Sequence, residues 1–227
     1  MRAALQALVL LALAPNGFAR TPRTLITVVT ADAAATSGEL RRWQRAGKRW
    51  RAVGAPIAVV VGKSGLTDVA DKREGDGASP AGRFRLGDVT GYDRKPPRGL
   101  KLHYRPADHL VCYDDPDVPD VYNVVADVRG YEWEFDEPHF EWMRRDDELY
   151  RYTIFVRHND ARVPGAGSCI FLHVWKDAAS PTVGCTAMAL DDLRTLLGWV
   201  DGDTRLVQLP RAEYDARQRD WDLPQRK

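Results

Sequence analysis

The chain has 227 residues, of which 44% are hydrophobic and 29% are charged, with 33 basic and 32 acidic side chains. This length fits one domain that buries enough apolar surface to fold without a disulfide scaffold or a structural metal, and the composition excludes collagen, a coiled coil and a disordered chain. The near balance of charge argues against a dedicated nucleic-acid-binding protein. Three cysteines are too few for a disulfide-rich module or a four-thiolate zinc site, and their odd number leaves at least one thiol unpaired.

The N-terminus has the pattern of a secretory signal. Arg2 precedes an apolar run over residues 3–14, and Gly17 and Ala19 are the small residues expected before a cleavage site. The run is too short to span a bilayer, so an uncleaved anchor and a buried helix are the less favoured interpretations. We expect residues 1–19 to be removed and the mature protein, without a membrane span, to reach the periplasm or cell envelope.

Most of the following elements are predicted to be strands. Five segments are short, rich in β-branched or aromatic residues and bounded by Gly, Pro or Asp, namely residues 24–30, 56–62, 152–158, 168–175 and 205–210. The basic segment 39–53 is predicted to form a hairpin that turns at Gly47, with a helix as the alternative. Its positive face is either simply solvated or a contact for an anionic polymer of the envelope.

Helices and loops account for the remainder. Amphipathic patterns predict helices over 141–150 and 189–201. Three turn-rich loops are predicted, at residues 74–82, 91–99 and 114–120. The main domain is expected to cover residues 20–210, and residues 211–227 to form a charged surface tail. The predicted fold class is mainly β with a few peripheral helices.

Motifs for cofactors and metals are incomplete. The glycines at 165–168 precede a strand and lack the third glycine of a dinucleotide loop, and EGDGASPAG at 74–82 has no Lys-Ser or Lys-Thr after it. The aspartates of 114–120 lack the glycine and glutamate of a calcium loop. The five histidines include no HExxH motif and no ligand-spaced pair. We therefore expect neither a cofactor nor a metal.

One pair of residues indicates nucleophilic chemistry. His173 lies inside an apolar strand, and Cys185 follows after a Ser-Pro-Thr loop and Gly184. A strand, a return loop and a second strand can place an imidazole beside a thiol, where the imidazole takes the thiol proton and the ion pair lowers the thiol pKa. Gly184 would let the backbone approach a substrate, and nearby amides would face an oxyanion. A core histidine with a small buried cysteine is the alternative.

At these residues the sequence resembles the exported L,D-transpeptidases, the YkuD-type catalytic domain, and in particular a branch with a GSAIFLH–PTAGC pattern. The corresponding segments are GSCIFLHVW (167–175) and SPTVGCTAMALDDL (180–193). Three upstream segments also match that branch in order: KREGDGASPAGRFRL (72–86), CYDDPDVPDVYN (112–123) and WMRRDDELYRYTIFVRHN (142–159). The resemblance extends from about residue 56 to about residue 200 and implies that family's β-sandwich fold.

The resemblance implies a reaction on peptidoglycan stem peptides. The cysteine attacks the carbonyl of the diamino acid, expels the terminal D-alanine and forms a thioester, which a second amine resolves as a 3→3 cross-link or another attachment. With water as the acceptor, the same site is an L,D-carboxypeptidase. A catalytically idle wall-binding module on the same fold is the third alternative, although binding alone requires neither His173 nor Cys185.

Roles for individual residues follow from the resemblance. It makes Cys185 the nucleophile, His173 the base and later the acid, and Gly184 with the Cys185 amide the oxyanion site. A backbone carbonyl, from Val174 or a near neighbour, would orient the imidazole. Substrate-binding roles fall on five residues, Thr182, Val174, Trp175, Tyr122 and Asn123. The expected partners are a tetrapeptide donor and an amine acceptor, with no nucleic acid, and the protein is expected to be a monomer.

The chain departs from the wider family at three positions. Val183 stands where many members have a second histidine, and Ala187 stands where they have Arg or Asn; the closer branch shares both changes. Cys169 replaces the branch's usual alanine. It is interpreted as a small core residue, as a disulfide partner of Cys112, or as a partner of Cys185 in a bond that would block catalysis. A papain-like protease and a sortase are disfavoured by the order and spacing of His173 and Cys185.

Overall fold

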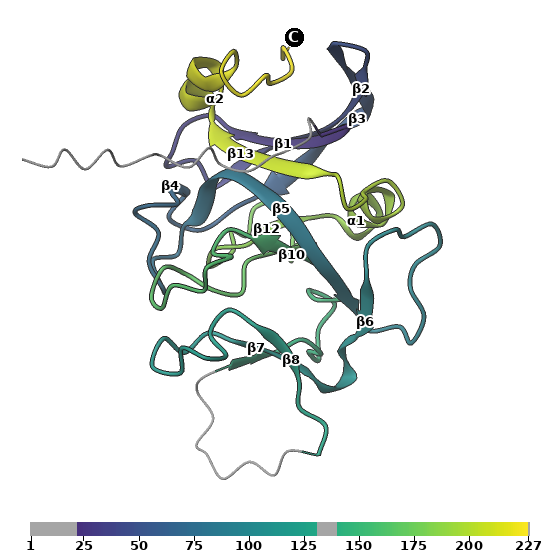
Figure 1. Ribbon diagram of the computed structural model, residues 1–227, viewed down its shortest axis with the longest axis vertical. Coiled ribbons are helices and arrows are strands. Elements are labelled where there is room, and N and C mark those ends of the chain that lie inside the picture. Colours follow the sequence, from purple (N-terminus) through teal and green to yellow (C-terminus); the bar gives the residue numbers. More distant parts are fainter. Residues whose placement is uncertain (1–21, 131–139, 227) are drawn as a thin grey trace, which may run out of the picture.

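The structure is a computed structural model that describes residues 22–130 and 140–226. The predicted signal segment therefore lies outside the described residues. The described chain contains thirteen strands and two α-helices, so the prediction of a mainly β fold with a few helices is confirmed (Figure 1). No helix among these residues is long and apolar enough to cross a membrane.

The main layer is one large sheet. Its strands are β1 (Thr24–Thr30), β2 (Ser37–Ala46), β3 (Arg49–Val60), β4 (Leu66–Asp68), β5 (Ser79–Gly91), β6 (Tyr104–Pro106), β10 (Tyr152–Arg157), β11 (Phe171–Val174), β12 (Thr186–Met188) and β13 (Arg205–Pro210). They are ordered β10-β11-β12-β3-β2-β1-β13-β5-β4, and β10 also pairs with β5. This last pairing closes the sheet on itself, so the ten strands form a single barrel-like sheet.

Each predicted strand overlaps an observed one, but the second arm of the hairpin and the predicted strand 56–62 form one continuous strand, β3, and the predicted strand 168–175 is shorter, as β11. β1 pairs with β2 and β13 at its two edges, and it is buried along its whole length because its apolar side chains belong to the main core. β2 and β3 form the predicted hairpin, and the turn contains Gly47 at a φ of +62°, which glycine adopts without a Cβ clash. The helix α1 (Leu190–Leu197) lies within the predicted segment 189–201 and buries Leu193, Leu196 and Leu197 in the main core.

Two predictions about the chain were wrong. Residues 141–150 do not form a helix: β9 (Phe140–Trp142) pairs with β7 (Leu110–Tyr113), and Asp147 accepts the Leu149 amide in a turn. The side chains that make this segment look amphipathic are therefore used for strand pairing and local hydrogen bonds. The C-terminal residues are not a simple surface tail either, because α2 (Arg211–Arg217) packs Tyr214 and, further on, Leu223 into the core.

A second, smaller sheet covers one face of the main sheet. We call this three-stranded sheet, β8 (Val125–Asp127), β7 and β9, the cap sheet. Figure 1 shows β7 and β8 below the main sheet, at the opposite end from β2, β3 and α2. A disulfide between Cys112 of β7 and Cys169, just before β11, ties the cap sheet to the main sheet. The sequence left the state of these cysteines open, and the structure pairs them and leaves Cys185 free.

Candidate active site

The strands β11 and β12 bring the two predicted catalytic residues onto neighbouring positions. They pair in parallel, with Leu172 opposite Thr186 and His173 opposite Ala187. Just before β12, the Cys185 sulfur accepts a hydrogen bond of 3.3 Å from the Phe171 amide. Because alternate residues of a strand share a face, His173 and Phe171 both point to the side of the sheet that the cap sheet covers.

His173 is held in one tautomer. Its Nδ1 lies 2.8 Å from the carbonyl oxygen of Val174. A carbonyl can only accept a hydrogen bond, so Nδ1 carries the proton and Nε2 keeps its lone pair. Val174 is in turn fixed by donating its own amide to the carbonyl of Leu149. Burial lowers the pKa of His173 to about 4, so the imidazole is neutral at neutral pH.

The thiol of Cys185 is buried and free. Its Sγ donates toward the carbonyl of Cys169 at 3.6 Å in addition to accepting from Phe171. Burial raises the pKa of the thiol to about 12, and the negative charge of Glu141 adds to that effect. The resting pair is therefore a neutral thiol with a neutral imidazole, rather than the ion pair that the residue pattern suggested.

Hydroxyl groups fix the loop before Cys185. The carbonyl of Cys185 accepts hydrogen bonds from Thr182 Oγ1 at 2.6 Å and from Ser79 Oγ at 2.8 Å. Thr182 Oγ1 also accepts the amide of Gly184 at 3.1 Å. Gly184 has a φ of +154°, and a Cβ there would lie 3.2 Å from Ile170 Cδ1. Thr182 thus shapes the turn, and Ser79, which the sequence analysis did not single out, braces the nucleophile's backbone from β5.

Asn123 connects the cap to the catalytic strand. Its side chain is buried, with Oδ1 accepting the Cys169 amide at 3.0 Å and Nδ2 donating to the Asn159 carbonyl at 3.0 Å. Cys169 has a φ of +53°, an unusual conformation for a residue with a Cβ. The disulfide and Asn123 together hold it there, and this conformation aims the Cys169 carbonyl at the Cys185 thiol.

Two of the predicted binding residues, Tyr122 and Trp175, are not among the residues that contact Cys185 or its loop. Tyr122 is fully buried and donates its hydroxyl to Glu74, which also accepts Ser168 Oγ at 2.7 Å. Tyr122 therefore anchors the cap loop through Glu74 and not through Cys185. Trp175 is half-buried and donates its amide to the Met188 carbonyl at 2.8 Å, which extends the β11–β12 pairing.

The two positions that depart from the wider family differ in exposure. Val183 is 76% exposed and stands beside the nucleophile as an apolar surface residue. Ala187 is completely buried next to His173. In this chain His173 is therefore the one imidazole on β11 and β12.

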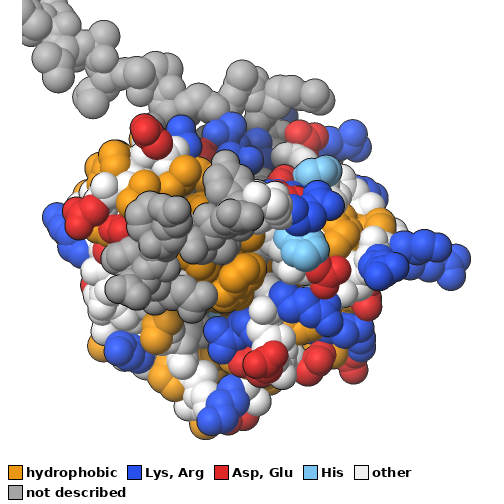
Figure 2. Space-filling model, turned by 90° about the horizontal axis from the view of Figure 1, so that it is seen from below, with side chains coloured by type: hydrophobic (Ala, Val, Ile, Leu, Met, Phe, Trp, Pro, Cys, Tyr) orange, Lys and Arg blue, Asp and Glu red, His pale blue; other side chains and the backbone are white. Residues whose placement is uncertain are grey.

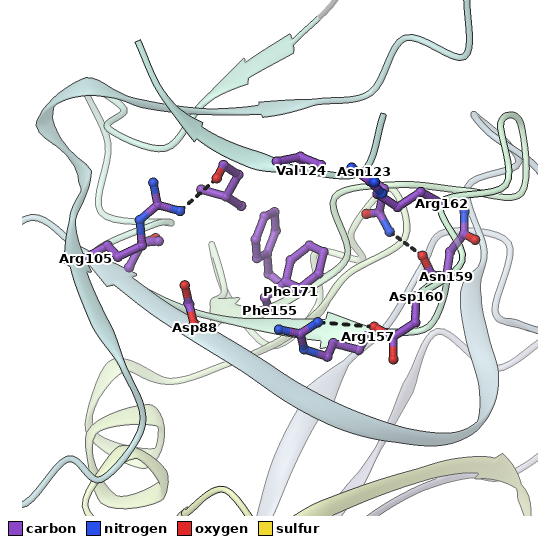
Figure 3. Close-up of a pocket in the computed structure, with 12 residues that line it drawn as sticks. Asp88, Arg105, Asn123, Val124, Phe155, Arg157, Asn159, Asp160, Arg162 and Phe171 are labelled. Atoms are coloured by element: carbon purple, nitrogen blue, oxygen red, sulfur yellow. Dashed lines mark hydrogen bonds and ion pairs between the residues drawn. The ribbon is translucent and has the colours of Figure 1, made fainter. Parts of the chain in front are cut away.

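A cavity of about 280 Å³ lies between the main sheet and the cap (Figure 3). Phe155 and Phe171 stand at its centre, with Asn123 and Val124 from the cap loop on one side. Three arginines line it: Arg105, Arg157 and Arg162. Arg157 shares Asp160 with Arg85, whereas Arg105 and Arg162 donate only to the backbone carbonyls of Val125 and Asp120 among the described residues.

The face of the molecule at the cap end carries side chains of both charges. Seen from the cap end, acidic and basic side chains are interspersed around hydrophobic ones (Figure 2). The cavity is also lined by both charges, since Asp88 and Asp160 lie among its residues together with the three arginines. Within the described ranges, one group offers three metal-ligand atoms close together, Cys112, Glu141 and Cys169. Its two sulfurs are joined in the disulfide, so this group does not fit a metal in the oxidised protein.

A barrel-like sheet that carries a free cysteine and a tautomer-fixed histidine on adjacent strands has the layout of a cysteine-dependent enzyme. The model of one family, YkuD, the L,D-transpeptidase catalytic domain, matches residues 25–208. This match covers most of the chain, and the protein belongs to the L,D-transpeptidase catalytic-domain family. Enzymes of this family act on peptidoglycan peptides and are typically exported. No curated protein and no solved structure matches the chain significantly.

Proposed function

We propose that the protein is an exported cysteine acyltransferase that cleaves the bond between the diamino acid and the terminal D-alanine of a peptidoglycan stem peptide. The acyl group passes to Cys185 as a thioester and then to an amine, which forms a 3→3 cross-link or another amide. One observation carries the proposal: a free buried thiol sits against the strand whose histidine keeps Nε2 unprotonated, because Nδ1 donates to Val174 at 2.8 Å.

The neutral resting pair determines the order of events in this mechanism. Burial keeps the proton on the Cys185 sulfur. The resting thiol therefore does not react with stray electrophiles as a permanent thiolate would. As Sγ approaches the substrate carbonyl, its proton passes to Nε2 of His173, and the Val174 carbonyl stabilises the imidazolium that forms. The imidazolium then protonates the departing amine of D-alanine. The Gly184 amide is occupied by Thr182, so the Cys185 amide is the main oxyanion donor that we propose.

The cavity between the sheet and the cap is where we propose that part of the peptide substrate binds, beside the catalytic pair, whose own side chains do not line it. Phe171 forms part of its floor, and the amide of the same residue holds the Cys185 sulfur. The guanidinium groups of Arg105 and Arg162 have no carboxylate partner among the described residues, so they can bind carboxylates of the stem peptide. Asn123 lines the same cavity while it fixes Cys169.

The proposal is tested with the mature protein and disaccharide-tetrapeptides, with products followed by mass spectrometry. Loss of D-alanine with dimer formation is expected, while loss without dimers would identify an L,D-carboxypeptidase. Cys185→Ala and His173→Ala should abolish D-alanine release, and His109→Ala, at an exposed cap-side position, should retain it. A folded wild-type protein that leaves the tetrapeptide unchanged would refute the catalytic proposal and favour a wall-binding module.

Export is also part of the proposal. The N-terminal signal pattern supports removal of residues 1–19 and delivery to the periplasm or envelope. An oxidising compartment is compatible with the Cys112–Cys169 disulfide. N-terminal sequencing of the protein secreted by its host would identify the cleavage site, and an intact Met1 on exported protein would contradict this assignment.

A further inference from the structure

A carboxylate of the cap sheet lies in the wall of the candidate active site. Glu141 is on β9, opposite Cys112 of β7, and its side chain is half-buried. Its carboxylate oxygen and the sulfurs of Cys112 and Cys169 all lie within 4.8 Å of one another. The carbonyl of Cys169 is the group that faces the Cys185 thiol. The Cys112–Cys169 disulfide, which joins the cap sheet to the main sheet, therefore also holds Glu141 close to β11.

Tyr150 links Glu141 to the catalytic histidine. Its hydroxyl donates to Glu141 Oε2 at 2.9 Å. The Tyr150 ring packs edge-on against the His173 ring, with centroids 5.2 Å apart, and tilts against Phe171 at 5.7 Å. Glu141, Tyr150 and His173 thus form a continuous row beside Cys185, and Glu141 is the charged group that raises the thiol pKa most.

Among the residues that the structure describes, no lysine or arginine forms an ion pair with this carboxylate, and Glu141 accepts a hydrogen bond from Tyr150. Arg145 is the nearby cation, but both its Nε and Nη2 are bound to Asp147, at 3.0 and 2.8 Å. The other charged groups that act on Glu141, Asp114 and Glu74, are also acidic. The surroundings therefore suit a ligand that brings a positive charge.

The reaction that we propose for this protein requires such a ligand. A primary amine arrives in water as an ammonium ion, which cannot attack a thioester until it loses a proton. After D-alanine leaves, His173 is neutral again, and its Nε2 is needed for the second amine proton, which it passes to the leaving sulfur. The first proton of the ammonium group therefore needs a different base. Burial raises the pKa of Glu141 to about 7, which suits a group that accepts and releases protons near neutral pH.

We propose that Glu141 binds the ammonium group of the acyl acceptor and serves as the base that deprotonates it, an assignment that rests on the acyltransferase function proposed above. The ammonium transfers one proton to the Glu141 carboxylate, and the free amine attacks the thioester carbon. The new carbon–nitrogen bond forms as the carbon–sulfur bond breaks, and the second amine proton reaches the Cys185 sulfur through His173. Glu141 then releases its proton to solvent. The residue would thereby favour amines over water as acceptors.

The experiment measures how the acyl-enzyme partitions between dimer and hydrolysed tripeptide. Wild type, Glu141→Gln and Glu148→Gln are each incubated with disaccharide-tetrapeptide, and the two products are quantified by mass spectrometry. Glu148 is an exposed glutamate near the same cap-side segment and is the matched control. We expect the dimer-to-tripeptide ratio to fall about tenfold or more in Glu141→Gln, since a general base contributes at least that much, and to stay unchanged in Glu148→Gln.

A second acceptor separates base catalysis from a structural effect. Hydroxylamine is uncharged at neutral pH and needs no base, so its hydroxamate-to-tripeptide ratio should change little in Glu141→Gln. Equal loss with both acceptors, or an unchanged dimer ratio in a variant that still releases D-alanine, would overturn the role of Glu141. Failure of the wild-type protein to release D-alanine would instead refute the proposed function itself.

Discussion

Replacing Glu141 with glutamine should make the protein more stable at alkaline pH. Glutamine keeps the shape of the side chain and an oxygen that accepts the Tyr150 hydroxyl, but it removes the charge. The folded-state pKa of Glu141 is raised from 4.5 to about 7, mainly by burial. The carboxyl is therefore neutral in the folded protein where it is already ionised in the unfolded chain, so wild-type stability falls as pH rises from 4.5 through 7.

The magnitude follows from the size of that shift. A change of about 2.5 pH units at about 1.36 kcal/mol per unit gives roughly 3 kcal/mol in the free energy of unfolding as an upper limit. Solvent reaches part of the side chain, so we expect about 2 kcal/mol. The loss is complete above the folded pKa and absent below the unfolded one.

Urea unfolding followed by tryptophan fluorescence measures this difference. Wild type, Glu141→Gln and the exposed control Glu148→Gln are compared from about pH 4.5 to about pH 8.5, with the disulfide intact. The advantage of Glu141→Gln over wild type should grow across this range and then level off. An advantage that is the same at every pH, or that Glu148→Gln shares, would refute the burial of a charge at Glu141.

Three further predictions concern the same region. Replacing both Cys112 and Cys169 with serine should lower the free energy of unfolding by about 4 kcal/mol, from the entropy of a loop of 57 residues; a drop below about 1 kcal/mol in urea titrations would show that the tether contributes little. Glu141→Gln should increase the rate of Cys185 alkylation by iodoacetamide a few-fold at mildly alkaline pH, because loss of the negative charge lowers the thiol pKa. A slower rate, measured by intact mass, would contradict that direction. Arg162→Gln should raise KM for a tetrapeptide with free carboxylates about tenfold more than for its amidated form; equal effects on both substrates would argue against carboxylate binding in the cavity.

Local patterns were reliable where a segment decides its own structure. Residues 24–30 and 205–210 carry β-branched and apolar side chains, and they form β1 and β13 with the predicted bounds. The hairpin around Gly47 also formed as predicted, since a turn glycine and two strand-forming arms are adjacent in sequence. In contrast, the amphipathic pattern of 141–150 predicted a helix that does not form. Its first residues pair with a strand about thirty residues away, with Glu141 opposite Cys112, and local periodicity does not reveal such a partner.

By itself, the sequence determined the fold class and the order of the catalytic candidates. A strand with His173, a loop and a Gly-Cys pair are contiguous, so their chemistry is visible in the residue pattern. Only the tertiary structure decided which cysteines pair, which nitrogen of His173 carries the proton and which carboxylate faces the thiol. Those properties depend on Val174, Cys112, Tyr150 and Glu141 meeting Cys185 and His173 in space. Burial and charge act over a few ångströms between segments far apart in the chain, which spacing along a sequence does not reveal.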